Sequence, residues 1–203
     1  MRMAGGTVIC AAVEGIVDEA VVRKLVDRAG GALGEVYGKQ GKSSLRQRIT
    51  GYNNAAQHAP WLVLVDLDSD EDCAPPLRSA WLPQPAPHLC FRVAVREVEA
   101  CLLADAERLA GFLSVARSSL PPDPERLGDP KATMVNLARA SRRRDIREDM
   151  VPRPGSGRQV GPAYSSRLIE FASADWRPDV AAGRADSLKR AMRCLKRLIK
   201  GAA

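Results

Sequence analysis

Residues 61–70, WLVLVDLDSD, decide the fold of this chain. Five apolar residues follow one another without alternation, as in a strand that is covered on both faces of a parallel sheet, and three aspartates come directly after them. Two other apolar runs have the same form: Thr7 to Val13 precedes Glu14, and Leu89 to Val95 precedes Glu97 and Glu99. Because the carboxyl ends of parallel strands share one edge, where open α/β sheets bind their ligands, we expect these acids to converge there.

The rest of the pattern predicts an α/β fold with a central parallel sheet of about four strands. A helix follows the first strand, with Asp18 as its expected N-cap and Gly30 and Gly31 at its end. A strand at 34–37, a helix at 45–57 and a proline-rich loop at 70–87 with one helical turn near Leu77 come next, while the strand at 89–95 alternates as an edge strand does.

Beyond residue 96 the helical period dominates. Asp186 is expected to cap a last amphipathic helix, with Leu188, Met192, Leu195 and Ile199 facing inward. The other predicted elements are one or two helices over 96–105 and 106–115, helices at 131–141 and 164–174, a connector at 121–130 and a flexible basic loop at 152–161. We therefore predict an α/β domain over residues 1–115 and a basic helical extension over residues 116–203 packed on it.

Composition narrows the class of protein. A chain of 203 residues with 45% hydrophobic content can bury a sizeable core. Five cysteines without CxxC spacing and only two histidines argue against a zinc site and a complete set of disulfides, and they favour reduced thiols. The sequence contains no signal-peptide pattern and no apolar run of membrane-spanning length, so we predict a cytoplasmic location away from the membrane.

Charge is distributed unevenly along the chain. From Arg139 onward there are 16 Lys and Arg against 7 Asp and Glu, whereas residues 1–138 carry 15 against 17. A basic flank beside an acidic site suits the binding of a nucleic-acid backbone, DNA in the first instance. A genome of high GC content would also give a protein rich in arginine, without any such function. The candidate backbone contacts are Arg142, Arg143, Arg144, Arg153 and Arg158, with the outer face of the helix at 189–200.

A cluster of carboxylates repels itself unless cations bind it, and hard Mg²⁺ or Mn²⁺ prefer carboxylate oxygens. The pattern therefore indicates a metal-dependent phosphoester enzyme. If a helix begins at Arg96, Glu97 and Glu99 lie about 200° apart around it, so only one of them can face the site. We favour Glu99 and keep Glu97 in reserve, and we interpret Asp18 as a helix cap alone.

Two motifs together resemble a known family. Residues 13–18, VEGIVD, and residues 64–68, LVDLD, resemble the Toprim domain that topoisomerases, bacterial primases and the overcoming-lysogenization-defect (OLD) nucleases share. The EGxxD pattern is similar to the nuclease branch, and residues 96–105, REVEACLLAD, resemble the bacterial domain-of-unknown-function family 4276. The resemblance covers residues 14–105 with a helical tail.

The resemblance implies a Toprim-like (Rossmann-like) fold and a nuclease activity, since no tyrosine context for a topoisomerase and no nucleotide-binding parts of a primase are recognisable. It implies that Glu14, Asp66 and Asp68 are metal ligands or the general base, with Asp70 a further candidate and Glu99 a candidate fourth position. Related nucleases work with an ATPase, so a separately encoded ATPase in a defence or DNA-processing system is an expected partner.

Alternatives remain open from the sequence. The loop at 38–43, GKQGKS, has Val36 where a phosphate-binding P-loop needs glycine, yet Lys39 or Lys42 could contact a scissile phosphate from it. The DxD motif is also similar to that of haloacid-dehalogenase phosphatases, which carry it after their first strand. A catalytically weak subunit that binds nucleic acid or protein, or a small-molecule phosphatase, are therefore alternative functions.

Overall fold

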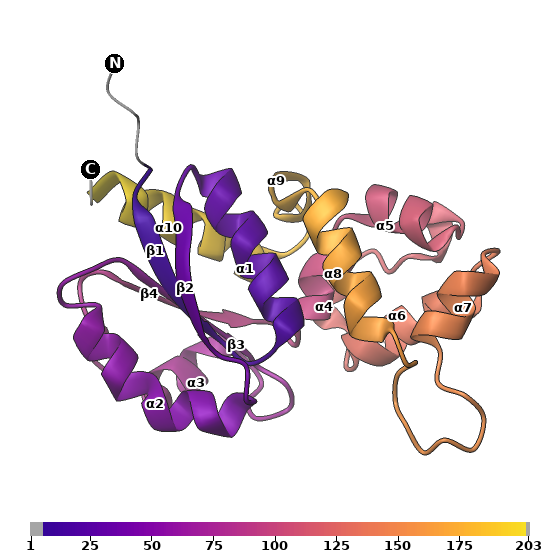
Figure 1. Cartoon of the computed structure of the whole chain (residues 1–203), viewed down its shortest axis with the longest axis horizontal. Coiled ribbons are helices and arrows are strands. Elements are labelled where there is room, and N and C mark those ends of the chain that lie inside the picture. The colour runs from indigo at the N-terminus through magenta and orange to yellow at the C-terminus, as the bar shows by residue number, and fades with distance from the viewer. Residues whose placement is uncertain (1–5, 202–203) are drawn as a thin grey trace.

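The computed structural model describes residues 6–201 as a three-layer α/β structure joined to a group of helices (Figure 1). All four strands are parallel, in the order β2-β1-β3-β4. Their bounds are Val8–Val13 for β1, Ala32–Gly38 for β2, Trp61–Asp66 for β3 and Leu89–Ala94 for β4. The predicted fold class, with β4 at an edge, is confirmed and is consistent with a Toprim-like fold.

Helices cover both faces of the sheet. On one face lie α1 (Ile16–Ala29) and α10 (Asp186–Gly201), and on the other lie α2 (Lys42–Ala55) and α3 (Ala74–Trp81) (Figure 1). The five leading residues of β3 are buried, as the unbroken apolar run predicts, because both faces are covered. The helical turn expected near Leu77 is a complete eight-residue helix.

The remaining helices lie beyond the end of β4. They are α4 (Val98–Leu103), α5 (Ala106–Leu113), α6 (Pro130–Arg139), α7 (Arg144–Met150), α8 (Tyr164–Ala174) and α9 (Pro178–Ala181), with short 3-10 turns at Arg117–Ser119 and Pro124–Arg126. α8 packs against α1, and α10 packs against β4 and α1. The predicted helix at 164–174 is confirmed, whereas α7 falls in a stretch for which the sequence predicts no helix.

One hydrophobic core joins the two halves of the chain. It runs from Ile9 in β1 and Leu25 in α1 to Phe171 in α8 and Leu195 in α10, while a second cluster lies under α2 and α3. The C-terminal segment therefore supplies part of one covering layer of the sheet, beside α1, and the boundary predicted near residue 115 stays a prediction. Among residues 6–201, no helix is both long and apolar enough to cross a bilayer.

Candidate active site

The direction in which successive strands are added to the sheet reverses between β1 and β3. β2 lies on one side of β1 and β3 on the other, so the carboxyl ends of β1 and β3 form the switch point at which open α/β sheets bind ligands. Glu14 follows β1 directly, and Asp66 is the last residue of β3. A Glu14 carboxyl oxygen, Oε1, accepts a 2.8 Å hydrogen bond from the backbone N–H of Asp66. The two predicted acids therefore lie together at this edge.

Asp18 belongs to the same group of acids, although the sequence pattern predicts a capping role alone. α1 begins at Ile16 with Gly15 as its N-cap, and Asp18 is the third helical residue, so the predicted N-cap position was wrong. Its Oδ2 accepts a 3.0 Å hydrogen bond from the Gly15 N–H. Its Oδ1 is buried and has no partner within residues 6–201, and the same is true of Asp66 Oδ1. Capping uses one oxygen of Asp18 and leaves the other available to a ligand.

Burial and mutual repulsion raise the pKa values of these carboxyls. Burial raises the pKa of Glu14 to about 7 and that of Asp18 to about 6. The pKa of Asp66 is raised first by burial and then by the charges of Asp18, Glu14, Glu99 and Asp68, in that order. Because each of these charges acts on Asp66, the five acids form one electrostatic unit, which we call the acidic rim.

Asp68 and Asp70 face a lysine. The Lys42 ammonium lies 2.8 Å from Asp68 Oδ2 and 2.9 Å from Asp70 Oδ2. Burial lowers the pKa of Lys42, but the two carboxylates outweigh it, so the pKa is raised and the ammonium stays charged. Asp68 has a left-handed backbone, with φ of 52°, and Arg96 holds it by donating to its carbonyl oxygen at 3.0 Å. Strained backbone of this kind is concentrated at functional sites.

The glycine loop of residues 38–41 places Lys42 beside these acids. Gly38 has φ of 88°, and a Cβ there would lie 2.2 Å from the Val13 carbonyl oxygen, so only glycine allows the approach. The Lys39 N–H donates to Val13 O at 2.9 Å, and the Gly41 N–H donates to Glu14 O at 3.0 Å. Of the two candidate lysines, Lys42 therefore reaches the acidic rim, whereas the exposed Lys39 pairs with Glu19.

Glu97 and Glu99 both reach one lysine of α6. Glu97 Oε1 lies 2.7 Å from Lys131 Nζ, and Glu99 Oε1 lies 3.9 Å from the same nitrogen. The condition behind the expected choice between them, a helix that begins at Arg96, was wrong, because α4 starts at Val98 and Glu97 is an extended N-cap residue outside the helix. Which of the two glutamates serves the site stays a prediction. Glu99 is buried, accepts a 3.2 Å hydrogen bond from the Tyr164 hydroxyl, and has a pKa raised to about 7, mainly by burial.

A cavity of about 400 Å³ opens beside the acidic rim. Asp68, Arg96 and Glu97 line it from the sheet side, and Asp129, Lys131 and Gln159 line it from the C-terminal segment. Lys131 and Tyr164 are functional candidates that the sequence did not reveal. Lys131 is more than thirty residues from Glu97 along the chain, and Tyr164 is more than sixty residues from Glu99. The C-terminal segment thus contributes side chains to the site as well as covering the sheet.

The side chains present suit a hard divalent cation in their chemistry. All donors are carboxylate oxygens, and the two buried oxygens without partners, Asp18 Oδ1 and Asp66 Oδ1, are acceptors that a cation would satisfy. Within the described part of the chain, however, no three His, Cys, Asp or Glu side chains are already arranged around one ion position. Binding would therefore require rotation of these side chains, and the assignment of metal ligands stays a prediction.

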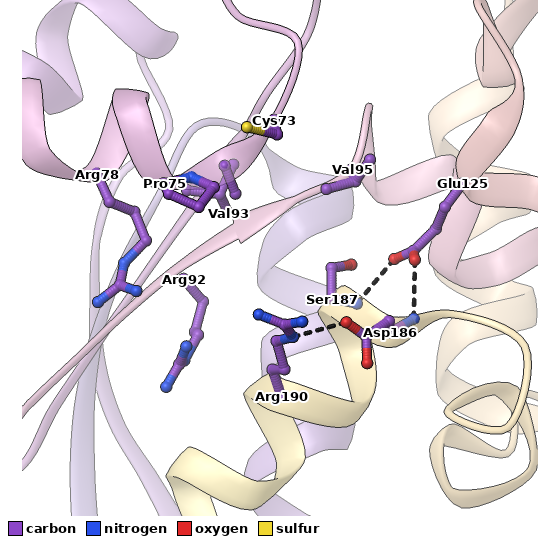
Figure 2. Close-up of a pocket in the computed structure, with 11 residues that line it drawn as sticks. Cys73, Pro75, Arg78, Arg92, Val93, Val95, Glu125, Asp186, Ser187 and Arg190 are labelled. Atoms are coloured by element: carbon purple, nitrogen blue, oxygen red, sulfur yellow. Dashed lines mark hydrogen bonds and ion pairs between the residues drawn. The ribbon is translucent and has the colours of Figure 1, made fainter.

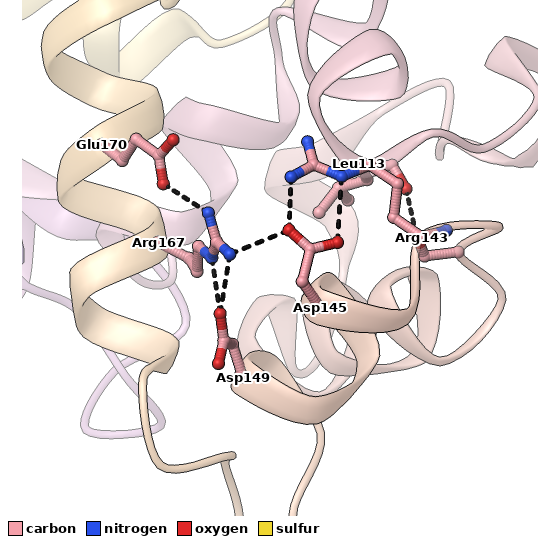
Figure 3. Close-up of polar contacts among 7 residues, drawn as sticks. Leu113, Arg143, Asp145, Asp149, Arg167 and Glu170 are labelled. Atoms are coloured by element: carbon pink, nitrogen blue, oxygen red, sulfur yellow. Dashed lines mark hydrogen bonds and ion pairs between the residues drawn. The ribbon is translucent and has the colours of Figure 1, made fainter.

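The five arginines predicted to contact nucleic acid are all exposed, but they differ in their pairing. Arg143 pairs with Asp145, and Arg144 lies 2.7 Å from Glu148. Over residues 6–201, Arg142, Arg153 and Arg158 form no ion pair. In Figure 3, Arg143 contacts Asp145, and Arg167 of α8 bridges Asp145, Asp149 and Glu170. The positive charges around Arg143 are therefore largely balanced by acids.

Comparison with known proteins gives one structural likeness. No family model matches the chain, and no curated protein sequence matches it. The solved structure of the C-terminal region of the Burkholderia pseudomallei OLD protein is similar, with a TM-score of 0.48 and 16% identity, over 98% of this chain and 99% of that one. The resemblance to Toprim and to family 4276 stays a prediction, and the function is inferred below from the residues of this chain.

Proposed function

We propose that this chain is a Toprim-type hydrolase of phosphodiester bonds in nucleic acid that works with Mg²⁺ or Mn²⁺ at the acidic rim. The single observation that carries the proposal is the pair of buried, unpartnered oxygens, Asp18 Oδ1 and Asp66 Oδ1, beside Glu14 at the switch point of the sheet. Unsatisfied buried acceptors are costly, and a bound cation is the ligand that would relieve both the missing contacts and the repulsion.

Each side chain then has a role that follows from its surroundings. Glu14, Asp66 and Asp68 would hold the cation, with Asp18, Asp70 and Glu99 as further ligands. A bound cation supplies Lewis acidity at the phosphate and lowers the pKa of water. Whichever of Glu14, Asp66 and Asp68 does not contact the cation would accept the proton of the attacking water.

The ammonium groups at the rim suit an anionic substrate. Lys42 stands against Asp68 and Asp70, and Lys131 stands against Glu97 and Glu99 beside the 400 Å³ cavity. Once a cation neutralises the carboxylates, both lysines become free to contact phosphate oxygens and to stabilise the charge that develops there. The unpaired Arg142, Arg153 and Arg158 would hold more distant phosphates.

Hydrolysis of labelled single-stranded, duplex and circular DNA, and of RNA, tests the proposal across a titration of Mg²⁺ and Mn²⁺. We expect cation-dependent cleavage by the wild-type chain and none by Asp66→Asn or Glu14→Gln. Glu35→Gln serves as the matched control, since Glu35 is an exposed glutamate on β2. Cleavage that persists in Asp66→Asn, or that needs no divalent cation, would contradict the proposal.

A second function is favoured by one observation. Among the described residues no three acids already surround one ion position. Lys42 pairs with Asp68 and Lys131 pairs with Glu97, so lysines neutralise acids where a cation would otherwise do so. This arrangement suits a catalytically weak subunit that binds nucleic acid or protein, with an ATPase encoded separately. Binding of DNA without cleavage under every cation condition, together with co-purification of an ATPase, would favour this function. Release of phosphate only from small phosphate esters would instead indicate a phosphatase.

A further inference from the structure

A separate cavity of about 320 Å³ lies at the open edge of the sheet (Figure 2). β4 has no strand on its outer side, and α3 and the first turn of α10 flank it there. Three arginines from three elements line the cavity: Arg78 from α3, Arg92 from β4 and Arg190 from α10. The rest of its wall is partly apolar, with Val93, Val95 and the first turn of α3. We call this cavity the arginine pocket.

The arginine pocket contains unsatisfied hydrogen-bond donors. Within residues 6–201, Arg78 Nε, Arg92 Nε and Ser187 Oγ are buried and have no nitrogen or oxygen partner, and Ser187 Oγ lies beside the Cys101 thiol. Within the described residues, the only other buried side-chain nitrogen or oxygen atoms in this condition are Asp18 Oδ1 and Asp66 Oδ1 of the acidic rim. A buried donor left without an acceptor destabilises the fold, and a charged donor does so more strongly. Three such groups around one cavity indicate that an acceptor belongs in it.

The acids of the arginine pocket are already engaged. Glu125 accepts hydrogen bonds from the backbone N–H groups of Asp186 and Ser187, at 2.8 and 2.9 Å, and so occupies the N-terminus of α10. Asp186 lies 2.6 Å from Arg190. Within residues 6–201 neither Arg78 nor Arg92 has an acidic partner, and Figure 2 shows both guanidinium groups without a marked contact. Among the residues that line the arginine pocket, three arginines therefore face two acids, an excess of one positive charge before neighbouring thiols are considered.

Arg92 has a second set of neighbours. Its guanidinium lies beside the thiols of Cys90 and Cys194, which raise its pKa against the lowering effect of burial. The pKa of Cys194 is lowered to about 5 by its hydrogen bond from Cys90 and by Arg92. Part of the Arg92 charge is thus balanced by sulfur. Arg78, on α3, has no such thiol neighbours among the contacts of the described residues, so it is the better probe of an external anion.

The chemistry of the donors identifies the ligand. One guanidinium suffices to bind a planar carboxylate through two parallel hydrogen bonds, whereas donors that arrive from three different elements suit a tetrahedral oxyanion with several oxygens. The volume exceeds that of a phosphate ion, and the apolar wall offers a surface for an organic group. We propose that the arginine pocket binds the phosphate group of an organic phosphate ester through Arg78, Arg92 and Ser187.

The phosphate could belong to a free mononucleotide or to a polynucleotide, and these two ligands would cover different parts of the protein surface. A free mononucleotide would fill the arginine pocket alone. A phosphate of a polynucleotide would have to extend around the edge of the sheet toward the acidic rim, and the two sites are close in the chain, since Val95 of the pocket precedes Arg96, which holds Asp68. The shared chemistry is the phosphate ester, and the experiment separates the sources.

Isothermal titration calorimetry of the whole chain in EDTA tests the proposal independently of any cation at the acidic rim. Adenosine monophosphate and a 5′-phosphorylated oligonucleotide are the probes, and adenosine and the unphosphorylated oligonucleotide are their controls. We expect binding that needs the phosphate, that weakens tenfold or more in Arg78→Gln, and that weakens less in Ser187→Ala. Arg126→Gln is the matched control, because Arg126 is an exposed arginine paired with Asp123.

The relative affinities of the two phosphorylated probes distinguish the two sources of the phosphate. Tighter binding of the mononucleotide indicates a free ligand, and tighter binding of the phosphorylated oligonucleotide indicates a polynucleotide end. Asp66→Asn should bind adenosine monophosphate as the wild type does, because the mononucleotide fills the arginine pocket alone, so a failure of the proposed nuclease activity leaves this result intact. Absence of phosphate-dependent binding, or equal weakening in Arg78→Gln and Arg126→Gln with Ser187→Ala unchanged, would overturn the proposal. Circular dichroism and thermal melts establish that each variant is folded.

Discussion

The acidic rim and the ion-pair network around Arg167 both contain clustered carboxylates, but the pKa values of these carboxylates are shifted in opposite directions. At the rim, burial and repulsion raise the pKa values of Glu14 and Asp18, and two carboxyl oxygens lack partners. In the network, the Arg143 guanidinium lowers the pKa of the exposed Asp145 to about 2, and Arg167 contacts three acids (Figure 3). Within residues 6–201 the acids of the network are paired with arginines, whereas the rim leaves two buried carboxyl oxygens without partners.

The largest expected effect is on activity at the rim. Asp66→Asn should reduce cation-dependent hydrolysis on the order of 10²-fold or more, because it removes a charge from the position that the other acids surround. The same substitution should leave the apo protein as stable as the wild type or slightly more stable, since it relieves repulsion. Initial rates and urea denaturation in EDTA measure the two effects. Unfolding of the variant would show that Asp66 is structural.

The pH dependence of stability should differ in sign between the two regions. The raised pKa values of Glu14 and Glu99, about 7 against 4.5, mean that the folded apo chain binds more protons than the unfolded chain between these values. Stability should therefore fall as the pH rises from about 5 to 7, by on the order of a few kcal/mol at most, since one pKa unit corresponds to about 1.4 kcal/mol. Saturating Mg²⁺ should reverse the fall by favouring the ionised acids.

The network titrates in another window. The pKa of Asp145 is lowered from 3.8 to about 2, so its contribution to stability is present above pH 4 and is lost as the pH falls toward 2. Urea denaturation at pH 5.5 and 8.0, in EDTA and in Mg²⁺, checks the rim, and Glu99→Gln should flatten the dependence. Stability of the apo protein that rises between pH 5.5 and 8.0 would contradict the comparison.

A smaller effect is expected from Arg167→Met. This substitution removes the bridge between α7 and α8 and leaves Asp149 without its arginine, so stability should fall by about 1 kcal/mol, less in high salt. The variant should keep full hydrolytic activity per folded molecule, because Arg167 is not part of the rim. Denaturation curves at two salt concentrations measure the loss. Arg23→Met, at an exposed pair on α1, is the control and should change stability by less.

The smallest effect concerns salt dependence of nucleic-acid binding. Substituting Arg142, Arg153 and Arg158 together by glutamine should reduce the slope of log affinity against log salt by up to about 3 for duplex DNA, one unit for each phosphate that the protein no longer neutralises. Arg143→Gln with Arg144→Gln should change the slope less, since both arginines already pair with acids. Equal slopes for the wild type and the triple variant would show that the unpaired arginines do not contact phosphates.

Much of the sheet and half of the site could be predicted from the sequence. Uninterrupted apolar runs followed by acids located the strands and placed Glu14 and Asp66 on one edge, because strand burial and edge position are local consequences of composition. Asp18 was missed because capping alone explains an aspartate in the first turn of a helix. Lys131 and Tyr164 were missed for another reason: their contacts depend on how the C-terminal helices fold back, which no local pattern encodes.

The position of α10 has a consequence for how the protein is made. α10 covers the face of β4 and packs on α1, although nearly a hundred residues separate it from β4 along the chain. During synthesis the strands leave the ribosome well before residues 186–201, and the apolar surface of β4 that α10 covers stays exposed until α10 has been made. This part of the nascent sheet is therefore open to chaperones and to aggregation for most of translation.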